Sequence, residues 1–196
     1  MNHRERMEKG LWYDANFDQE LCQLRNKADD LCFQFNHIKP SQQRSLQNIL
    51  KQLFPNLGQN VTILSPMYAD YGFRTSIGDG TFINHDAYFM DGGKITIGRN
   101  CFIGPHCGLY TANHPLLFEE RNQGYEIALP IVIEDNVWIG ADVTILPGVT
   151  IGEGSVIGAK SLVNKDIPPH VIAVGNPCHV LRKITKDDTI FDECDL

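Results

Sequence analysis

A histidine outside any repeat is the residue of this 196-residue chain best suited to chemistry at neutral pH. His114 lies between Asn113 and Pro115 in a stretch that carries no periodic pattern. An imidazole has an ordinary pKa near ~6.5, so it can remove a proton from a hydroxyl group while that group attacks an ester or thioester. A single histidine in a loop is also often an ordinary surface residue, and its position alone leaves both interpretations open.

Composition excludes several classes of protein. The formal net charge of −7 and the pI near 5.4 argue against nucleic acid as the partner, because such proteins present a cationic face. No run of ~20 apolar residues is present, so we expect no membrane span. The charged N-terminus lacks the apolar segment of a signal peptide. The six cysteines show no C-x-x-C spacing, which favours free thiols in a reducing cytoplasm; they are Cys22, Cys32, Cys101, Cys107, Cys178 and Cys194.

Aliphatic or aromatic residues recur every six positions over most of the chain. A period of six predicts short strands separated by tight corners, with each strand pairing in parallel to the strand one coil away. The aliphatic residue of each repeat should point inward, and the glycine that often follows it should permit backbone angles that other residues resist. The sequence therefore predicts a mainly β fold, a parallel β-helix. The repeat positions are Ile77, Ile83, Phe89, Ile97, Ile103, Leu109, Ile133, Ile139, Ile145, Ile151, Ile157 and Val163.

Two segments flank this repeat and one interrupts it. Apolar residues at helical spacing predict one helix over Asp18–Phe35 and a second that starts at Pro40–Ser41 and ends near Pro55. We therefore expect an N-terminal helical cap over residues 1–58, a β-helix over 59–170 and a C-terminal capping segment over 171–196. Residues 111–130 should leave the coil as a protruding loop, and long loops on rigid scaffolds often carry function.

Motifs spread along nearly the whole chain resemble those of the hexapeptide-repeat acyltransferases, and more narrowly those of the maltose/galactoside O-acetyltransferases. They are Gly10–Asp14, Phe35–His37, Asp70–Gly72, Thr111–Pro115, Asn136–Gly140, Leu146–Gly152, Lys165–Pro168 and Gly175–Pro177. The resemblance implies a left-handed parallel β-helix and a homotrimer with active sites between subunits. It also implies acetyl-CoA as co-substrate, a sugar or glycoside hydroxyl as acceptor, and no required metal.

The resemblance also implies roles for individual residues. His114 would be the general base, and transfer would be direct, with no acyl-enzyme; the absence of a G-x-S-x-G nucleophile motif agrees with this. Asn84 would donate a hydrogen bond to the oxyanion, although a hydrogen-bonding corner residue is the alternative. The acceptor would contact Asp14, Asp70, Asn84 and Asp91, since carboxylates and amides can fix sugar hydroxyls.

Coenzyme A would need an apolar slot and cations for its phosphates. By resemblance the cofactor-binding residues are Trp138, Ala141, Ala159, Asn164, Lys165 and Arg182. For Trp138 a buried core aromatic is the alternative interpretation. Three departures from the family pattern leave the acceptor and the strength of nucleotide binding open: Phe82, Gly92 and His179.

Two other functions stay open at this point. A metal enzyme resembling γ-class carbonic anhydrase would bind zinc through three histidines from neighbouring subunits, and His85, His106 and His114 are available. A trimeric scaffold without catalysis would keep the repeats and lose the chemistry.

Overall fold

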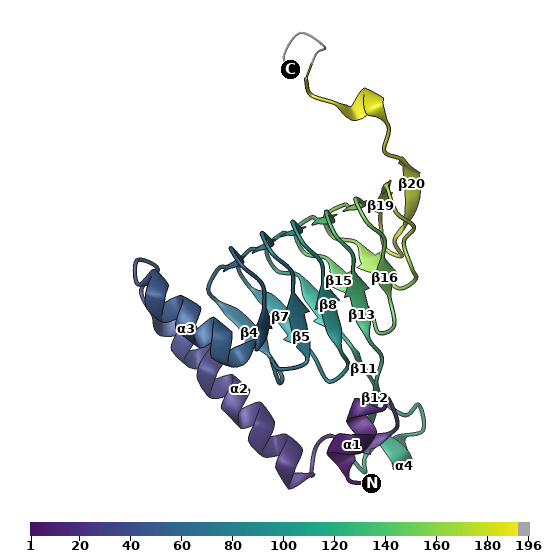
Figure 1. Ribbon diagram of the computed structural model, residues 1–196. Coiled ribbons are helices and arrows are strands. Elements are labelled where there is room, and N and C mark those ends of the chain that lie inside the picture. The colour runs from purple at the N-terminus through teal and green to yellow at the C-terminus, as the bar shows by residue number, and fades with distance from the viewer. Residues whose placement is uncertain (192–196) are drawn as a thin grey trace.

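The computed structural model describes residues 1–191, so Cys194 and the end of the predicted C-terminal capping segment lie outside the described residues. The chain is a β solenoid whose short strands stack along one axis (Figure 1). Helices α2 (Gln19–His37) and α3 (Gln43–Leu53) lie at the end of the solenoid where the first coils begin. Within residues 1–191, no helix combines the length and apolar character needed to cross a membrane. The predicted parallel β-helix is confirmed.

Three sheets form the sides of the coil, and their coil-to-coil pairs are parallel. The seven-stranded sheet contains β3 (Thr62–Ile63), β6 (Phe82–Ile83), β9 (Phe102–Ile103), β14 (Trp138–Ile139), β17 (Val156–Ile157), β19 (Val171–Val174) and β20 (His179–Lys183). One five-stranded sheet contains β4 (Met67–Ala69), β7 (Ala87–Met90), β10 (Gly108–Tyr110), β15 (Thr144–Ile145) and β18 (Leu162–Val163). The other contains β2 (Asn56–Leu57), β5 (Thr75–Ile77), β8 (Ile95–Ile97), β13 (Ile131–Ile133) and β16 (Thr150–Ile151). At the C-terminal end β20 turns back antiparallel to β19, and a short 3-10 helix, η1 (Lys186–Asp188), follows.

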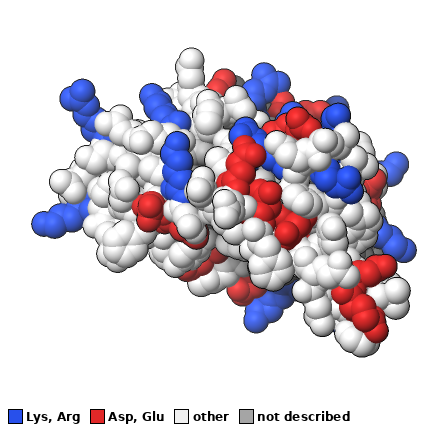
Figure 2. All heavy atoms as spheres, turned by 90° about the horizontal axis from the view of Figure 1, so that it is seen from below, with Lys and Arg blue, Asp and Glu red and all other residues white. Residues whose placement is uncertain are grey.

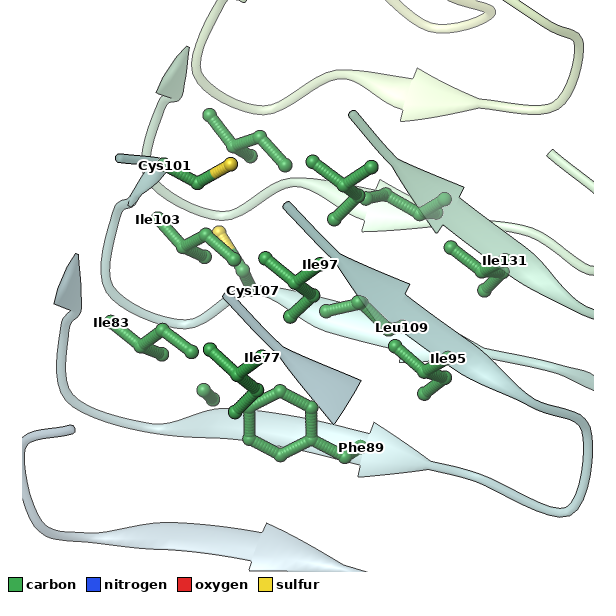
Figure 3. Close-up of a cluster of buried hydrophobic side chains, with 14 of the residues drawn as sticks. Ile77, Ile83, Phe89, Ile95, Ile97, Cys101, Ile103, Cys107, Leu109 and Ile131 are labelled. Carbon is green, nitrogen blue, oxygen red and sulfur yellow. The ribbon is translucent and has the colours of Figure 1, made fainter. Parts of the chain in front are cut away.

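The inward residues of successive coils stack into columns. Ile83 pairs with Ile103, and Ile103 pairs with Ile139. Figure 3 shows Ile83 and Ile103 turned into the interior, with the sulfur atoms of Cys101 and Cys107 near Ile103. All five side chains are buried, and burying each aliphatic one stabilises the fold by ~1.5–3 kcal/mol. The period of six therefore builds the core as predicted, and both thiols are packing atoms.

The glycines beside these aliphatic residues serve a purpose different from the predicted one. Gly78 has a φ outside the left-handed region, but a Cβ on it would lie 2.6 Å from the carbonyl carbon of Gly98 in the next coil. The left-handed corners lie two residues after the glycine position and are occupied by Asn100 (φ 53°), His106 (φ 59°) and Lys160 (φ 61°). The close approach of neighbouring coils, and not the backbone angle, is what requires glycine at these positions.

Both predicted helices of the N-terminal region are confirmed as α2 and α3. Asp18 caps α2, since its carboxylate accepts a hydrogen bond from the backbone N–H of Leu21 at 3.0 Å. A third helix, α1 (His3–Glu8), was not predicted because six residues are too few to show a periodicity. A capping box between Asn2 and Glu5 starts it.

The stretch predicted as a protruding loop is an ordered hairpin. Strands β11 (Ala112–Asn113) and β12 (Tyr125–Ala128) pair antiparallel, and α4 (Phe118–Arg121) lies at the tip. Strand β1 (Tyr13–Asp14) of the N-terminal region adds to the other side of β12, giving a small sheet of order β1-β12-β11. The N-terminal region is thus joined to the hairpin by backbone hydrogen bonds.

Candidate active site

The hairpin fixes the orientation of His114, which directly follows β11. Its Nδ1 lies 3.1 Å from the carbonyl oxygen of Tyr125, the first residue of β12. A carbonyl oxygen can only accept, so this contact places the proton of a neutral imidazole on Nδ1 and the lone pair on Nε2. The side chain is exposed. His114 is therefore oriented to accept a proton at Nε2 from an incoming hydroxyl group.

Strand β1 brings Asp14 close to this histidine. Asp14 is paired with Tyr125, the residue whose carbonyl holds the His114 ring. One carboxylate oxygen of Asp14 accepts hydrogen bonds from the backbone N–H groups of Asn16 and Phe17, at 3.0 and 2.9 Å. These bonds fix the turn that leads into α2 and hold the carboxylate in place. The structure thus brings together two residues predicted to form the site.

A half-buried acid near His114, Glu126, was not singled out from the sequence. Glu126 accepts a hydrogen bond from the hydroxyl of Tyr13. Burial raises the pKa of Glu126, while the hydrogen bond from Tyr13 and the charge of His114 act to lower it. Burial also raises the pKa of Tyr13, so its hydroxyl stays protonated. Gly92 makes room for the pair, because a Cβ there would lie 2.8 Å from the Tyr13 oxygen.

Asp70 is close enough to Glu126 for its charge to raise the pKa of Glu126, and the charge of Arg25 acts on both carboxylates. The hydroxyl of Tyr88 donates to Asp70 Oδ1 at 2.5 Å. Burial raises the pKa of Asp70, whereas the Tyr88 hydrogen bond and the charge of Arg25 lower it. Arg25 of α2 donates to the hydroxyl of Tyr71 at 2.7 Å, and its charge also lowers the pKa of Glu126. Arg25 was not singled out from the sequence. Its positive charge favours the ionised form of two carboxylates from different parts of the chain, Asp70 and Glu126.

Asp91 was expected to contact the acceptor, but it lies in the interior of the protein. Its side chain is 0 % exposed. Its carboxylate accepts from the backbone N–H groups of Tyr71 and Gly72, at 2.8 and 3.2 Å, and from the hydroxyl of Thr75 at 3.0 Å. Burial raises its pKa to about 6 despite these bonds. Asp91 holds the turn between β4 and β5, and no surface of it is open to an acceptor.

Asn84 follows β6 at a corner of the coil. Its Oδ1 accepts a hydrogen bond from the backbone N–H of His85 at 2.8 Å. This bond holds the amide in place, and within residues 1–191 its Nδ2, which is a donor only, donates no hydrogen bond. Asn84 is therefore a corner residue that also presents a donor, and the two interpretations of it are compatible.

The outer face of the seven-stranded sheet carries an apolar strip. Phe82, Phe102 and Trp138 occupy the same position in successive coils. Phe102 is 57 % exposed and Trp138 is 56 % exposed, which excludes Trp138 as a core aromatic. Ala141 and Ala159 lie at the following corner, where small side chains leave room for a ligand. We call Phe82, Phe102 and Trp138 the apolar strip.

A cleft at the end of the coil contains two of the predicted cofactor-binding residues. Its volume is about 310 Å³, and it is lined by Asn164, Lys165, Asp166, Ile167, Pro177, Cys178, His179 and Val180. Arg182 does not line this cleft. Its guanidinium instead forms two hydrogen bonds to the Asp188 carboxylate, at 2.8 and 2.6 Å.

The three histidines of the zinc hypothesis have different surroundings. His85 Nδ1 lies 2.5 Å from the carbonyl oxygen of Ser65, and His106 Nδ1 lies 3.4 Å from the carboxylate of Asp86. Both are at corners of the coil, whereas His114 is on the hairpin. In the part of the chain that the structure describes, no three His, Cys, Asp or Glu side chains are grouped closely enough to hold a metal ion.

The predicted residues thus form two groups within the chain. Asp14, Asp70 and His114 lie around the hairpin and α2, whereas Asn84 and Trp138 lie on the seven-stranded sheet and its corner. Among residues 1–191, no hydrogen bond joins one group to the other. Figure 2 views the molecule from the side of the hairpin, where acidic side chains gather toward the middle and most Lys and Arg lie toward the edges.

A solenoid of six-residue repeats, a helical cap and a hairpin that carries an oriented histidine together define a hexapeptide-repeat acyltransferase. Residues 6–58 match the family described as the maltose acetyltransferase hexapeptide capping motif. Residues 130–165 match six bacterial transferase hexapeptide repeats, and residues 94–109 match the hexapeptide repeat of succinyl-transferase. The chain belongs to the maltose/galactoside O-acetyltransferase family, and it is an acetyltransferase of that type.

Relatives support this assignment over the whole length of the chain. A Staphylococcus aureus (strain Mu50) protein named "Putative acetyltransferase SAV2555" is 55 % identical over 196 residues, covering 98 % of each chain. The crystal structure of a maltose O-acetyltransferase from Clostridium difficile 630 is 42 % identical with a TM-score of 0.92, covering 95 % of this chain and 99 % of that one. A galactoside acetyltransferase in complex with coenzyme A is 37 % identical with a TM-score of 0.91, covering 98 % and 97 %.

Proposed function

We propose that this protein transfers an acetyl group from acetyl-CoA to a hydroxyl of a sugar or glycoside, with His114 as general base. The observation that carries the proposal is the contact of His114 Nδ1 with the Tyr125 carbonyl, because it leaves Nε2 free to take the hydroxyl proton. Asp14 and Asp70 supply carboxylates that can fix the acceptor's hydroxyls. The maltose and galactoside enzymes among the relatives support the choice of acceptor class.

The residues suggest a direct reaction. The acceptor oxygen forms a bond to the thioester carbonyl carbon while its proton passes to His114 Nε2. Negative charge develops on the former carbonyl oxygen, and the Asn84 Nδ2 group donates a hydrogen bond to it. The C–S bond then breaks, and the proton moves from His114 to the sulfur of coenzyme A. The carboxylate of Glu126 stabilises the imidazolium that exists between the two proton transfers.

The cysteines support a mechanism without an acyl-enzyme. Cys101 and Cys107 are buried in the coil interior. Burial raises the pKa of both thiols, that of Cys107 to about 11, so neither forms the reactive thiolate near neutral pH. The described cysteines are all free, which supports a reducing compartment such as the cytoplasm.

The apolar strip and the end cleft fit the two halves of coenzyme A. Trp138 would pack along the pantetheine arm, and Ala141 and Ala159 leave room for it at the corner. Lys165 and Asn164 in the cleft would face the phosphates, since a lysine neutralises phosphate charge. Arg182 would join them only by exchanging its Asp188 partner for a phosphate.

We also propose a homotrimer in which neighbouring protomers bring the two groups of residues together. Asn84 and Trp138 lie on a sheet that does not include the hairpin. The apolar strip has two aromatic side chains more than half exposed, and such patches usually mark ligand or subunit contacts. A neighbour's hairpin placed against the strip would complete a site with base, oxyanion donor and cofactor slot.

The test is an acetyl-transfer assay that detects free coenzyme A in the presence of a panel of sugars and glycosides. We expect acceptor-dependent release with the native protein and a loss of about 10²–10⁴-fold in His114→Ala. His37→Ala is the matched control, because His37 is also exposed but lies on α2. Release that no sugar increases would refute the proposed acceptor class, and equal activity in both variants would refute the base.

A further inference from the structure

A second pocket opens beside His114 and is not used by the proposed reaction. It has a volume of about 400 Å³ and is lined by Arg6, Trp12, Pro115, Glu120, Gln123 and Tyr125. This volume falls in the range of small-molecule sites, ~300–1,000 Å³. The lining comes from three places in the chain: the N-terminal region, the tip of the hairpin and the start of β12.

The pocket and the base share their supports. Pro115 directly follows His114 in the chain, and Tyr125 provides the carbonyl that holds the His114 ring. Trp12 directly precedes β1, which pairs with β12. A molecule in the pocket would therefore contact both the residue that follows His114 in the chain and the residue whose carbonyl holds its ring.

The lining has the chemistry that a sugar ring requires. Trp12 is 40 % exposed, so part of its ring is open to pack on the apolar C–H face of a pyranose. Arg6, Glu120 and Gln123 supply donors and acceptors around that ring for the hydroxyls. Arg6 Nε donates to the Trp12 backbone carbonyl oxygen at 2.5 Å, which fixes the guanidinium beside the Trp12 backbone. Among residues 1–191, the Glu120 carboxylate forms no hydrogen bond or ion pair, so it is open to a ligand.

We propose that this pocket is a second sugar subsite, which binds the neighbouring ring of the acceptor while the first ring presents its hydroxyl to His114. The proposal rests on the proposed acetyl transfer to sugars and narrows it to acceptors of two or more rings. The proposed reaction uses only Asp14 of the Gly10–Asp14 motif. The subsite gives Trp12, in the same motif, the role of packing against the second ring.

The kinetic test compares a disaccharide with its own monosaccharide, maltose with glucose and lactose with galactose. We expect a higher kcat/KM for at least one disaccharide. Trp12→Ala should lower kcat/KM for that disaccharide about tenfold and leave the monosaccharide within about twofold. Phe118→Ala is the matched control, since Phe118 is an exposed aromatic of the same hairpin that does not line the pocket. Equal losses for both sugars, or no loss for either, would overturn the subsite.

A binding test separates this inference from the proposed reaction, because it needs no turnover. The chain has two tryptophans, so in Trp138→Phe the fluorescence reports on Trp12 alone. We expect maltose or lactose to change this emission and the matching monosaccharide to change it less. If neither disaccharide changes it, the subsite is refuted even where sugars are acetylated. If the emission changes but no sugar is acetylated, the subsite stands and the proposed reaction fails.

Discussion

Replacing Asp91 with asparagine removes a buried charge and keeps the shape of the side chain. Tyr71 and Gly72 donate their backbone N–H groups to the same oxygen, Oδ1, and the Thr75 hydroxyl donates to the other. An asparagine can present its carbonyl oxygen to the two backbone groups. Its amide nitrogen then faces the threonine hydroxyl, which can turn to accept. We therefore expect the variant to fold with the same turn.

The magnitude follows from the pKa of Asp91, which burial raises from an ordinary 3.8 to about 6. At ~1.4 kcal/mol per pH unit, this difference amounts to about 3 kcal/mol. Because the folded pKa is the higher one, the folded state binds the proton more tightly than the unfolded state. The stability that the folded state gains from this tighter proton binding at Asp91 is fully present below pH ~4. It is lost as the pH rises through about 6. Relative to Asp91→Asn, the native protein should thus lose about 3 kcal/mol between pH 3 and pH 7.

The assay is denaturant unfolding of both proteins at several pH values and one protomer concentration. The difference between them isolates Asp91, because other carboxyls with raised pKa values, such as Asp70 and Glu126, are present in both. A difference that stays constant across this pH range would refute the reasoning. The variant should also keep the native KM for the sugar acceptor. A large increase in that KM would return Asp91 to the acceptor-binding role expected from the sequence.

Three further predictions test the site and the coil. Glu126→Gln should lower kcat about tenfold and leave the KM for acetyl-CoA unchanged in steady-state kinetics, because a neutral amide stabilises the imidazolium less; an unchanged kcat would remove Glu126 from the mechanism. Gly78→Ala should lower the free energy of unfolding by more than ~1 kcal/mol, because its Cβ would lie 2.6 Å from the next coil. Lys160→Gly, at a corner with φ 61°, is the comparison and should change the free energy of unfolding by less than ~1 kcal/mol. If denaturant unfolding shows that Lys160→Gly destabilises the protein more than Gly78→Ala does, the close-approach explanation is wrong. Lys165→Ala should raise the KM for acetyl-CoA about tenfold at low salt and less at high salt, and the KM for the acceptor is the internal control. If the effect of the substitution on the KM for acetyl-CoA does not depend on salt, Lys165 does not face the phosphates.

The coil could be predicted because its physical requirement repeats. Each side of each coil must bury one aliphatic side chain, so the requirement appears in the sequence every six residues. The same argument located the two longer helices, whose apolar faces recur at helical spacing. It failed for the glycines, since Gly78 and its equivalents are required by the distance to the next coil. A spacing in the sequence shows that a position is special without showing which physical constraint makes it so.

The surroundings of His114 could not be predicted because they depend on pairing between distant segments. Tyr13 and Glu126 meet only through the register of β1 and β12, and neither two-residue β1 nor the hairpin shows an alternating pattern. In the sequence Arg25 is an ordinary polar position of α2, yet in the fold its charge acts on both Asp70 and Glu126. The same limit explains Asp91. The family resemblance placed it among the acceptor contacts, but its burial depends on the turn formed by Tyr71 and Gly72.

The N-terminal region therefore does more than cover one end of the coil. The coil is repetitive and offers nearly the same corner and the same strip at each turn, so it can bind an elongated cofactor but does not by itself mark one position for chemistry. That position is set by the hairpin, because His114 is oriented by a carbonyl of β12, and β12 is held on its other side by β1. Helix α2 adds Arg25 beside Asp70. The irregular segments of the chain thus supply the proposed base, its charged neighbours and the pocket proposed for a second ring, while the regular segment supplies the surface along which coenzyme A would lie.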